Sequence, residues 1–279
     1  MSDYPAKLLV SKRQNWRCVP LLKAKELQMK HHEKLGQVGR KSFSLLARLG
    51  RYELAMLLCV AVLSGGIWGF IALADEVIEG DTRSIDESLL LALRNPADLS
   101  DPIGPGWVEE MGRDFTALGG VGVLVLITLG ALGYLLLARH YRAALFASIA
   151  VPGGILLSTV MKLGFDRPRP DLVPHEAMVY TASFPSGHSM MSAVTYLTLA
   201  ALLIRVQPAL RLKAYLLILA ILLTLLVGIS RVYLGVHWPT DVLAGWTAGA
   251  SWAALCWIVM HWLQRHGQLE PEESSSSIE

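Results

Sequence analysis

Three basic residues, Lys162, Arg169 and Arg231, fall at or just beyond the ends of long apolar segments in the second half of the chain. A charged residue at the edge of such a segment is costly and calls for a functional explanation. An arginine fork matches the oxygens of a phosphate group, whereas a lysine acts as a point charge. Together these residues predict a cationic site that binds an oxyanion, most simply a phosphoryl group.

The motif Pro185-Ser186-Gly187-His188 opens one of these apolar segments. A helix that begins here would present the N–H groups of Ser186, Gly187 and His188 at its N-terminus. Such a terminus favours anions through its free donors and its dipole, and glycine lets the backbone approach closely. We therefore add these three residues to the predicted phosphate site.

His237 and Asp241 are four residues apart, so a helical turn can place the carboxylate against one ring nitrogen. A carboxylate in this position orients the imidazole and stabilises its charged form, as in a supported base or nucleophile. These residues alone leave open whether His237 attacks phosphorus or activates a water molecule. His188, beside the anion site, can donate a proton to a departing oxygen.

A metal site is the competing interpretation of two histidines and an aspartate. Three nearby cations would repel a metal ion, and no acidic cluster accompanies the histidines. We therefore expect no metal and no other cofactor.

The candidate site residues lie between long apolar segments, which must position their side chains. Apolar residues make up 53% of the 279 residues. Only 17% are charged, against about 25% in typical soluble domains, which excludes a disordered chain and most soluble enzymes. The net charge of +2 gives no reason to expect nucleic-acid binding. The apolar segments are 54–74, 115–138, 143–161, 190–204, 214–229 and 242–260. We predict an all-α integral membrane protein, a bundle of six transmembrane helices.

The distribution of Lys and Arg predicts the orientation of the bundle. Of the 25 basic residues, 18 lie in the N-terminal segment, the loops after the second and fourth apolar segments, and the tail. This places both termini in the cytoplasm, so that 162–189 and 230–241 face outward. Every candidate site residue then lies on the outward face, expected to be the periplasmic side of a bacterial inner membrane.

We divide the chain into three parts. Residues 1–53 form a basic cytoplasmic segment with 12 Lys and Arg, which either lies on anionic lipid or is a solvated tail. Residues 54–262 form the six-helix domain, whose outer loop 75–114 holds 11 Asp and Glu. Residues 263–279 are an acidic, Ser-rich tail that we predict to be disordered.

The outer loop also contains a helix signal. Ser84-Ile85-Asp86-Glu87 matches the S-x-x-E capping box, in which Ser caps a helix and Glu reaches back to the cap. We predict a short helix on the outer surface, capped by Ser84 and ended by Asn95-Pro96.

Three motifs occur in order: Lys162-x6-Arg169-Pro170, Pro185-Ser186-Gly187-His188, and Ser230-Arg231-x5-His237-x3-Asp241. This set resembles the three-part signature of the type 2 phosphatidic acid phosphatases. That superfamily includes bacterial lipid-diphosphate phosphatases, glucose-6-phosphatase and vanadium haloperoxidases. The resemblance covers roughly residues 75–262.

The resemblance implies roles for the site residues. His237 would be the nucleophile that forms a phosphohistidine, Asp241 would support it, and His188 would protonate the leaving group. The phosphate would be held by Lys162, Arg169, Ser186, Gly187 and Arg231. Inside the first motif, Asp166 either pairs with Arg167 or tunes the charge of the site.

We therefore expect a metal-independent phosphatase whose partners are the bilayer and a lipid phosphate or diphosphate. Undecaprenyl diphosphate, phosphatidylglycerol phosphate, phosphatidic acid and lipid A phosphate are all compatible. A lipid-linked phosphotransferase shares the covalent step and is the first alternative. An organophosphate transporter is less favoured. Such a protein would bind its substrate at helices broken near the bilayer midplane, whereas the charged residues of this sequence lie at the ends of the predicted spans. A vanadium haloperoxidase is disfavoured because the spans leave no obvious soluble helical domain.

Overall fold

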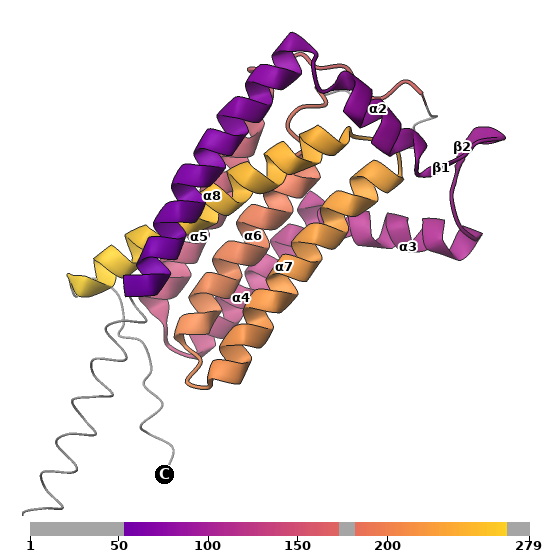
Figure 1. Cartoon of the computed structure of the whole chain (residues 1–279). Coiled ribbons are helices and arrows are strands. Elements are labelled where there is room, and N and C mark those ends of the chain that lie inside the picture. Colours follow the sequence, from indigo (N-terminus) through magenta and orange to yellow (C-terminus); the bar gives the residue numbers. More distant parts are fainter. Residues whose placement is uncertain (1–52, 173–181, 267–279) are drawn as a thin grey trace, which may run out of the picture. The chain divides into compact units, whose positions relative to one another are not determined.

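The computed structural model describes residues 53–172 and 182–266, most of which are helical. The first described helix, Glu53–Glu79, precedes the bundle elements shown in Figure 1. These are α2 (Arg83–Leu91), β1 (Arg94–Asn95), β2 (Asp98–Pro102), α3 (Gly106–Ala117), α4 (Val121–Leu137), α5 (Tyr141–Lys162), α6 (Gly187–Arg205), α7 (Leu210–Tyr233) and α8 (Pro239–Arg265). The predictions made for residues 1–52 and 267–279 lie outside the described residues.

Among the described residues, five helices are long and apolar enough to cross a membrane. They are Glu53–Glu79, α5, α6, α7 and α8, and the pair α3–α4 adds a sixth if it is counted as one span. The two shortest predicted spans lengthen to 19 residues in α6 and 24 in α7. The predicted all-α membrane bundle is confirmed, and its helices extend beyond the uncharged runs because polar residues continue them at each end.

The predicted uninterrupted helix over 115–138 is wrong in one respect, because α3 and α4 meet at an angle of 55°. Gly120 has an extended backbone and precedes the first residue of α4. A Cβ at Gly119 would lie 2.4 Å from Cγ1 of Val227, so only glycine allows this close approach to α7. The hydroxyl of Tyr196 donates to the carbonyl of Leu118 over 2.7 Å and satisfies an acceptor that the bend releases.

The close contact between α6 and α8 sets the position of the site. A Cβ at Gly245 would lie 2.8 Å from the carbonyl oxygen of Ser186, and one at Gly249 would lie 2.5 Å from Cβ of Ala193. Small residues four apart let two membrane helices approach closely. The N-terminus of α6 is thereby held against the first turns of α8.

The capping box predicted at Ser84 does not form. Helix α2 begins at Arg83, Ser84 lies inside it, and its N-cap residue Thr82 makes no side-chain cap. Glu87 pairs instead with Nε of Arg83 at 2.8 Å. The helix ends at Leu91, before the hairpin of β1 and β2. The fully buried Asp86 of the same helix instead contacts the first turn of α8, where it accepts the N–H of Thr240.

Candidate active site

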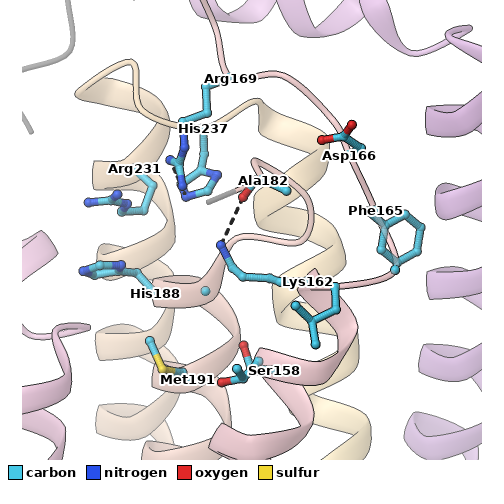
Figure 2. Close-up of a pocket in the computed structure, with 14 residues that line it drawn as sticks. Ser158, Lys162, Phe165, Asp166, Arg169, Ala182, His188, Met191, Arg231 and His237 are labelled. Atoms are coloured by element: carbon cyan, nitrogen blue, oxygen red, sulfur yellow. Dashed lines mark hydrogen bonds between the residues drawn. The ribbon is translucent and has the colours of Figure 1, made fainter. Parts of the chain in front are cut away.

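A pocket of about 710 Å³ opens where α5 ends, α6 begins and α7 ends. Figure 2 shows the side chains that line it. The predicted site residues in this lining are Lys162, Arg169, Gly187, His188, Arg231 and His237. The structure therefore brings residues from all three sequence motifs to one cavity.

His237 lies at the wall of this pocket and is only 1% exposed. Its Nδ1 lies 3.3 Å from Oδ2 of Asp241, and its Nε2 lies 3.2 Å from Nη1 of Arg169. Because a guanidinium only donates, Nε2 accepts this hydrogen bond and Nδ1 carries the proton that faces Asp241. The predicted pair is formed, and the lone pair of the imidazole lies on Nε2.

Burial lowers the pKa of His237 to about 4, although the hydrogen bond and the charge of Asp241 both act to raise it. The imidazole of the free protein is therefore neutral at pH 7. Burial also lowers the pKa of Arg169, but a guanidinium stays charged under these conditions. The site thus places a neutral imidazole beside a cation.

Asp241 is fully buried, and both of its carboxylate oxygens are occupied. Oδ2 accepts hydrogen bonds from the hydroxyl of Ser183 and, at 2.9 Å, from the backbone N–H of Trp238. Oδ1 accepts from Nη1 of Arg167 at 2.6 Å. These partners fix the carboxylate that orients His237.

Arg231 is 7% exposed and extends from the last turn of α7. Its Nη1 donates to the hydroxyl of Thr116 at 2.9 Å. Its Nε is buried and finds no hydrogen-bond partner among the described residues. An unpaired buried donor is costly, and Arg231 is also one of the residues that line the pocket.

Lys162 lies in the last turn of α5, and its Nζ donates to the carbonyl of Ala182 at 3.2 Å (Figure 2). A Cβ at Gly187 would lie 3.1 Å from Cε of this lysine. The glycine therefore lets the ammonium approach the N-terminus of α6, where the first N–H groups lack helical acceptors.

Ser186 is the N-cap residue of α6 and is fully buried. Its N–H donates to the backbone carbonyl of Asp241 at 2.9 Å, so this group is not free for an anion as the sequence suggested. Its hydroxyl accepts a hydrogen bond from Ser189 at 2.9 Å. Gly187 and His188 are the first two residues of α6, and the roles of Ser186, Gly187 and His188 in binding a phosphate stay predictions.

Comparison with known proteins identifies the family. Residues 141–265 match the PAP2 superfamily. Phosphatidylglycerophosphatase B of Bacillus subtilis (strain 168) is 35% identical over 190 residues, which cover 64% of this chain and 85% of that protein. The chain belongs to the PAP2 superfamily.

Two further relatives agree with this membership. Lipid A 1-phosphatase of Rhizobium etli is 30% identical over 185 residues, 57% of this chain and 75% of that protein. The crystal structure of a transmembrane PAP2 type phosphatidylglycerolphosphate phosphatase from Bacillus subtilis has a TM-score of 0.64 at 29% identity. The match covers 74% of this chain and 97% of the other. The chain is a PAP2-type lipid phosphatase of the membrane branch, as its three motifs predicted.

Arg167 and Asp86 hold the site of this PAP2 phosphatase in a way that the sequence motifs did not predict. Arg167 pairs with Asp86 and Asp241, each at 2.6 Å, and its pairing with these two carboxylates replaces the one considered with Asp166. Asp166 lines the pocket itself. The run Arg167-Pro168-Arg169-Pro170 contained a usable signal, because a proline after each arginine favours an extended backbone that can cross the site.

Proposed function

We propose that this PAP2 phosphatase removes a phosphoryl group from a membrane lipid phosphate or diphosphate through a phosphohistidine on His237, at the outer face of a bacterial inner membrane. One observation carries the proposal. The unprotonated Nε2 of His237 faces a pocket lined by Lys162, Arg169 and Arg231, while Asp241 holds the opposite nitrogen.

In this mechanism Nε2 attacks phosphorus as the bond to the leaving oxygen breaks. The three cations and the N-terminus of α6 offset the charge on the equatorial oxygens, which is the main requirement of phosphoryl transfer. Asp241 stabilises the charge that develops on the imidazole of His237. A water molecule then attacks phosphorus as the bond to Nε2 breaks, which releases inorganic phosphate and returns His237 to its neutral form.

Arg169 links substrate binding to the exposure of the nucleophile. In the free protein its Nη1 hydrogen-bonds to Nε2 of His237, and the same nitrogen donates to the carbonyl of Val236 at 2.8 Å. The hydrogen bond to the neutral imidazole carries charge only on the guanidinium, whereas a bond to a phosphate group carries opposite charges on both partners and can be bidentate, which makes it stronger. The arriving phosphate therefore draws Arg169 away and frees the lone pair of His237.

The rest of the pocket suits a lipid. Leu163, Phe165 and Met191 line it together with Ser158 and Thr159. An acyl or prenyl chain can contact the apolar side chains while its phosphate reaches the cations. The phosphatidylglycerophosphate and lipid A phosphate named for the relatives, with undecaprenyl diphosphate and phosphatidic acid, make the substrate panel.

The test uses the purified full chain in detergent with this lipid panel. We expect phosphate release in EDTA, and rapid quenching with labelled substrate should trap a phosphoenzyme that is stable in alkali and lost in acid, as a phosphohistidine is. Phosphate release without any trappable phosphoenzyme under rapid quenching would favour His237 acting on water. Activity restored only by a divalent cation would contradict the proposal. Turnover that depends on an added lipid or sugar acceptor would indicate the phosphotransferase.

A second measurement tests the role of His188. If this residue protonates the leaving oxygen, His188→Ala should reduce hydrolysis of a lipid phosphate by about 10²- to 10⁴-fold. Hydrolysis of p-nitrophenyl phosphate should fall much less, because p-nitrophenolate leaves without a proton. An equal loss on both substrates would instead assign His188 to phosphate binding.

A further inference from the structure

Asp86 is a fully buried carboxylate on α2, far in sequence from the three motifs of the site. Its Oδ1 accepts the backbone N–H of Thr240 at 3.0 Å, and its Oδ2 accepts the hydroxyl of the same residue at 2.6 Å. Thr240 lies in the first turn of α8, directly before Asp241. Asp86 thus satisfies a free N–H group at the helix start from another part of the chain.

Arg167 connects the two buried carboxylates. Its Nη2 donates to Oδ2 of Asp86 at 2.6 Å, and its Nη1 donates to Oδ1 of Asp241 at the same distance. The side chain is only 13% exposed. The guanidinium fork therefore bridges α2 and α8, and a second contact holds it 5.7 Å above the ring centre of Trp238.

The chain of contacts ends at the nucleophile. Oδ1 of Asp241 is held by Arg167, which leaves Oδ2 to face the Nδ1 proton of His237. A change at Asp86 must act through Arg167 and Thr240 before it reaches the imidazole. No atom of Asp86 or Arg167 lies in the lining of the pocket.

We infer that Asp86 and Arg167 are positioning residues, which hold the His237–Asp241 pair in its reactive orientation from the outer helix α2. Burying two carboxylates and a guanidinium costs desolvation energy that apolar residues of similar size would avoid. A precise orientation of the nucleophile accounts for this cost, because small displacements of a reacting group reduce its rate strongly. The inference rests on the nucleophilic role proposed for His237.

The experiment compares Asp86→Asn, Arg167→Gln and the double variant with Asp81→Asn, which makes the same charge change at an exposed position of the same loop. We expect Asp86→Asn and Arg167→Gln each to lower kcat by about 10- to 100-fold, as outer-shell partners of reactive groups commonly do. KM and the inhibition constant of inorganic phosphate should stay unchanged, because the cations of the pocket are untouched. The double variant should lose little more than Arg167→Gln, since both residues act through one chain of contacts.

If the Asp86→Asn variant does not fold, the Arg167→Lys variant tests the positioning role instead. It keeps the charge, but a single ammonium lacks the fork that bridges Asp86 and Asp241, so kcat alone should fall. A wild-type kcat in either folded variant overturns the inference, and so does a weakening of phosphate inhibition in proportion to kcat. Failure of the proposed function is separate, because it is measured on the wild-type protein, which would then release no phosphate or would release it without a trappable phosphoenzyme.

Discussion

Replacing His237 with asparagine should abolish phosphate release, with a loss of about 10⁴-fold or more in kcat, the scale seen when a covalent nucleophile is removed. The amide nitrogen of asparagine can occupy the place of Nδ1 and keep the hydrogen bond to Asp241. It offers no counterpart of the lone pair on Nε2, which is the atom that faces the cations of the pocket. The measurement is turnover of the lipid phosphate together with trapping of the labelled phosphoenzyme, and both should disappear.

His140→Asn is the matched control for this substitution. His140 is the N-cap residue of α5, at the opposite end of that helix from Lys162. The His140→Asn substitution should leave turnover and phosphoenzyme formation unchanged. A labelled phosphoenzyme in the His237→Asn variant, or a turnover rate well above the expected remainder, would show that another group attacks phosphorus.

The parts of the fold that depend on local sequence patterns were predictable. Long apolar runs specify membrane helices because the bilayer requires every backbone group to be bonded within its own segment. The bend between α3 and α4 was not predictable in this way, because Gly119 and Gly120 sit inside an apolar run that satisfies the length rule. Gly119 at this bend lies against Val227 of α7, a tertiary contact that the length of the run does not reveal.

In the site, too, local contacts were predictable from the sequence and contacts between distant residues were not. His237 and Asp241 meet because a helical start joins residues four apart, which the spacing already contains. The partner of Arg167 depends on folding, since Asp86 lies 81 residues away and the nearer Asp166 faces the pocket instead. Ser84 likewise lacks its predicted capping role, since α2 begins one residue earlier, at Arg83, and Asp86 of the same helix contacts α8. Local motifs therefore revealed the groups proposed to react, whereas the groups that position them became visible only in the structure.

Arg231→Gln should reduce kcat/KM by about 10²- to 10³-fold, the cost of removing one preorganised donor from a site where negative charge develops. The side chain is 7% exposed, and Thr116 holds Nη1 while the buried Nε has no partner among the described residues. Arg231→Lys should recover only part of the loss, because an ammonium keeps the charge without the fork. Inhibition by inorganic phosphate should weaken in both variants.

The Arg231→Gln variant should be at least as stable to heat as the wild-type protein. This result would separate a ligand-binding role of Arg231 from a structural one. A buried guanidinium with an unpaired Nε that shares a pocket with Lys162 and Arg169 costs free energy in the absence of ligand. Glutamine removes that charge. Arg211→Gln makes the same change in the first turn of the same helix, at an exposed position, and should alter neither activity nor melting temperature. A marked fall in the melting temperature of Arg231→Gln, with phosphate inhibition retained, would show that Arg231 serves the fold of α7 and not the phosphate.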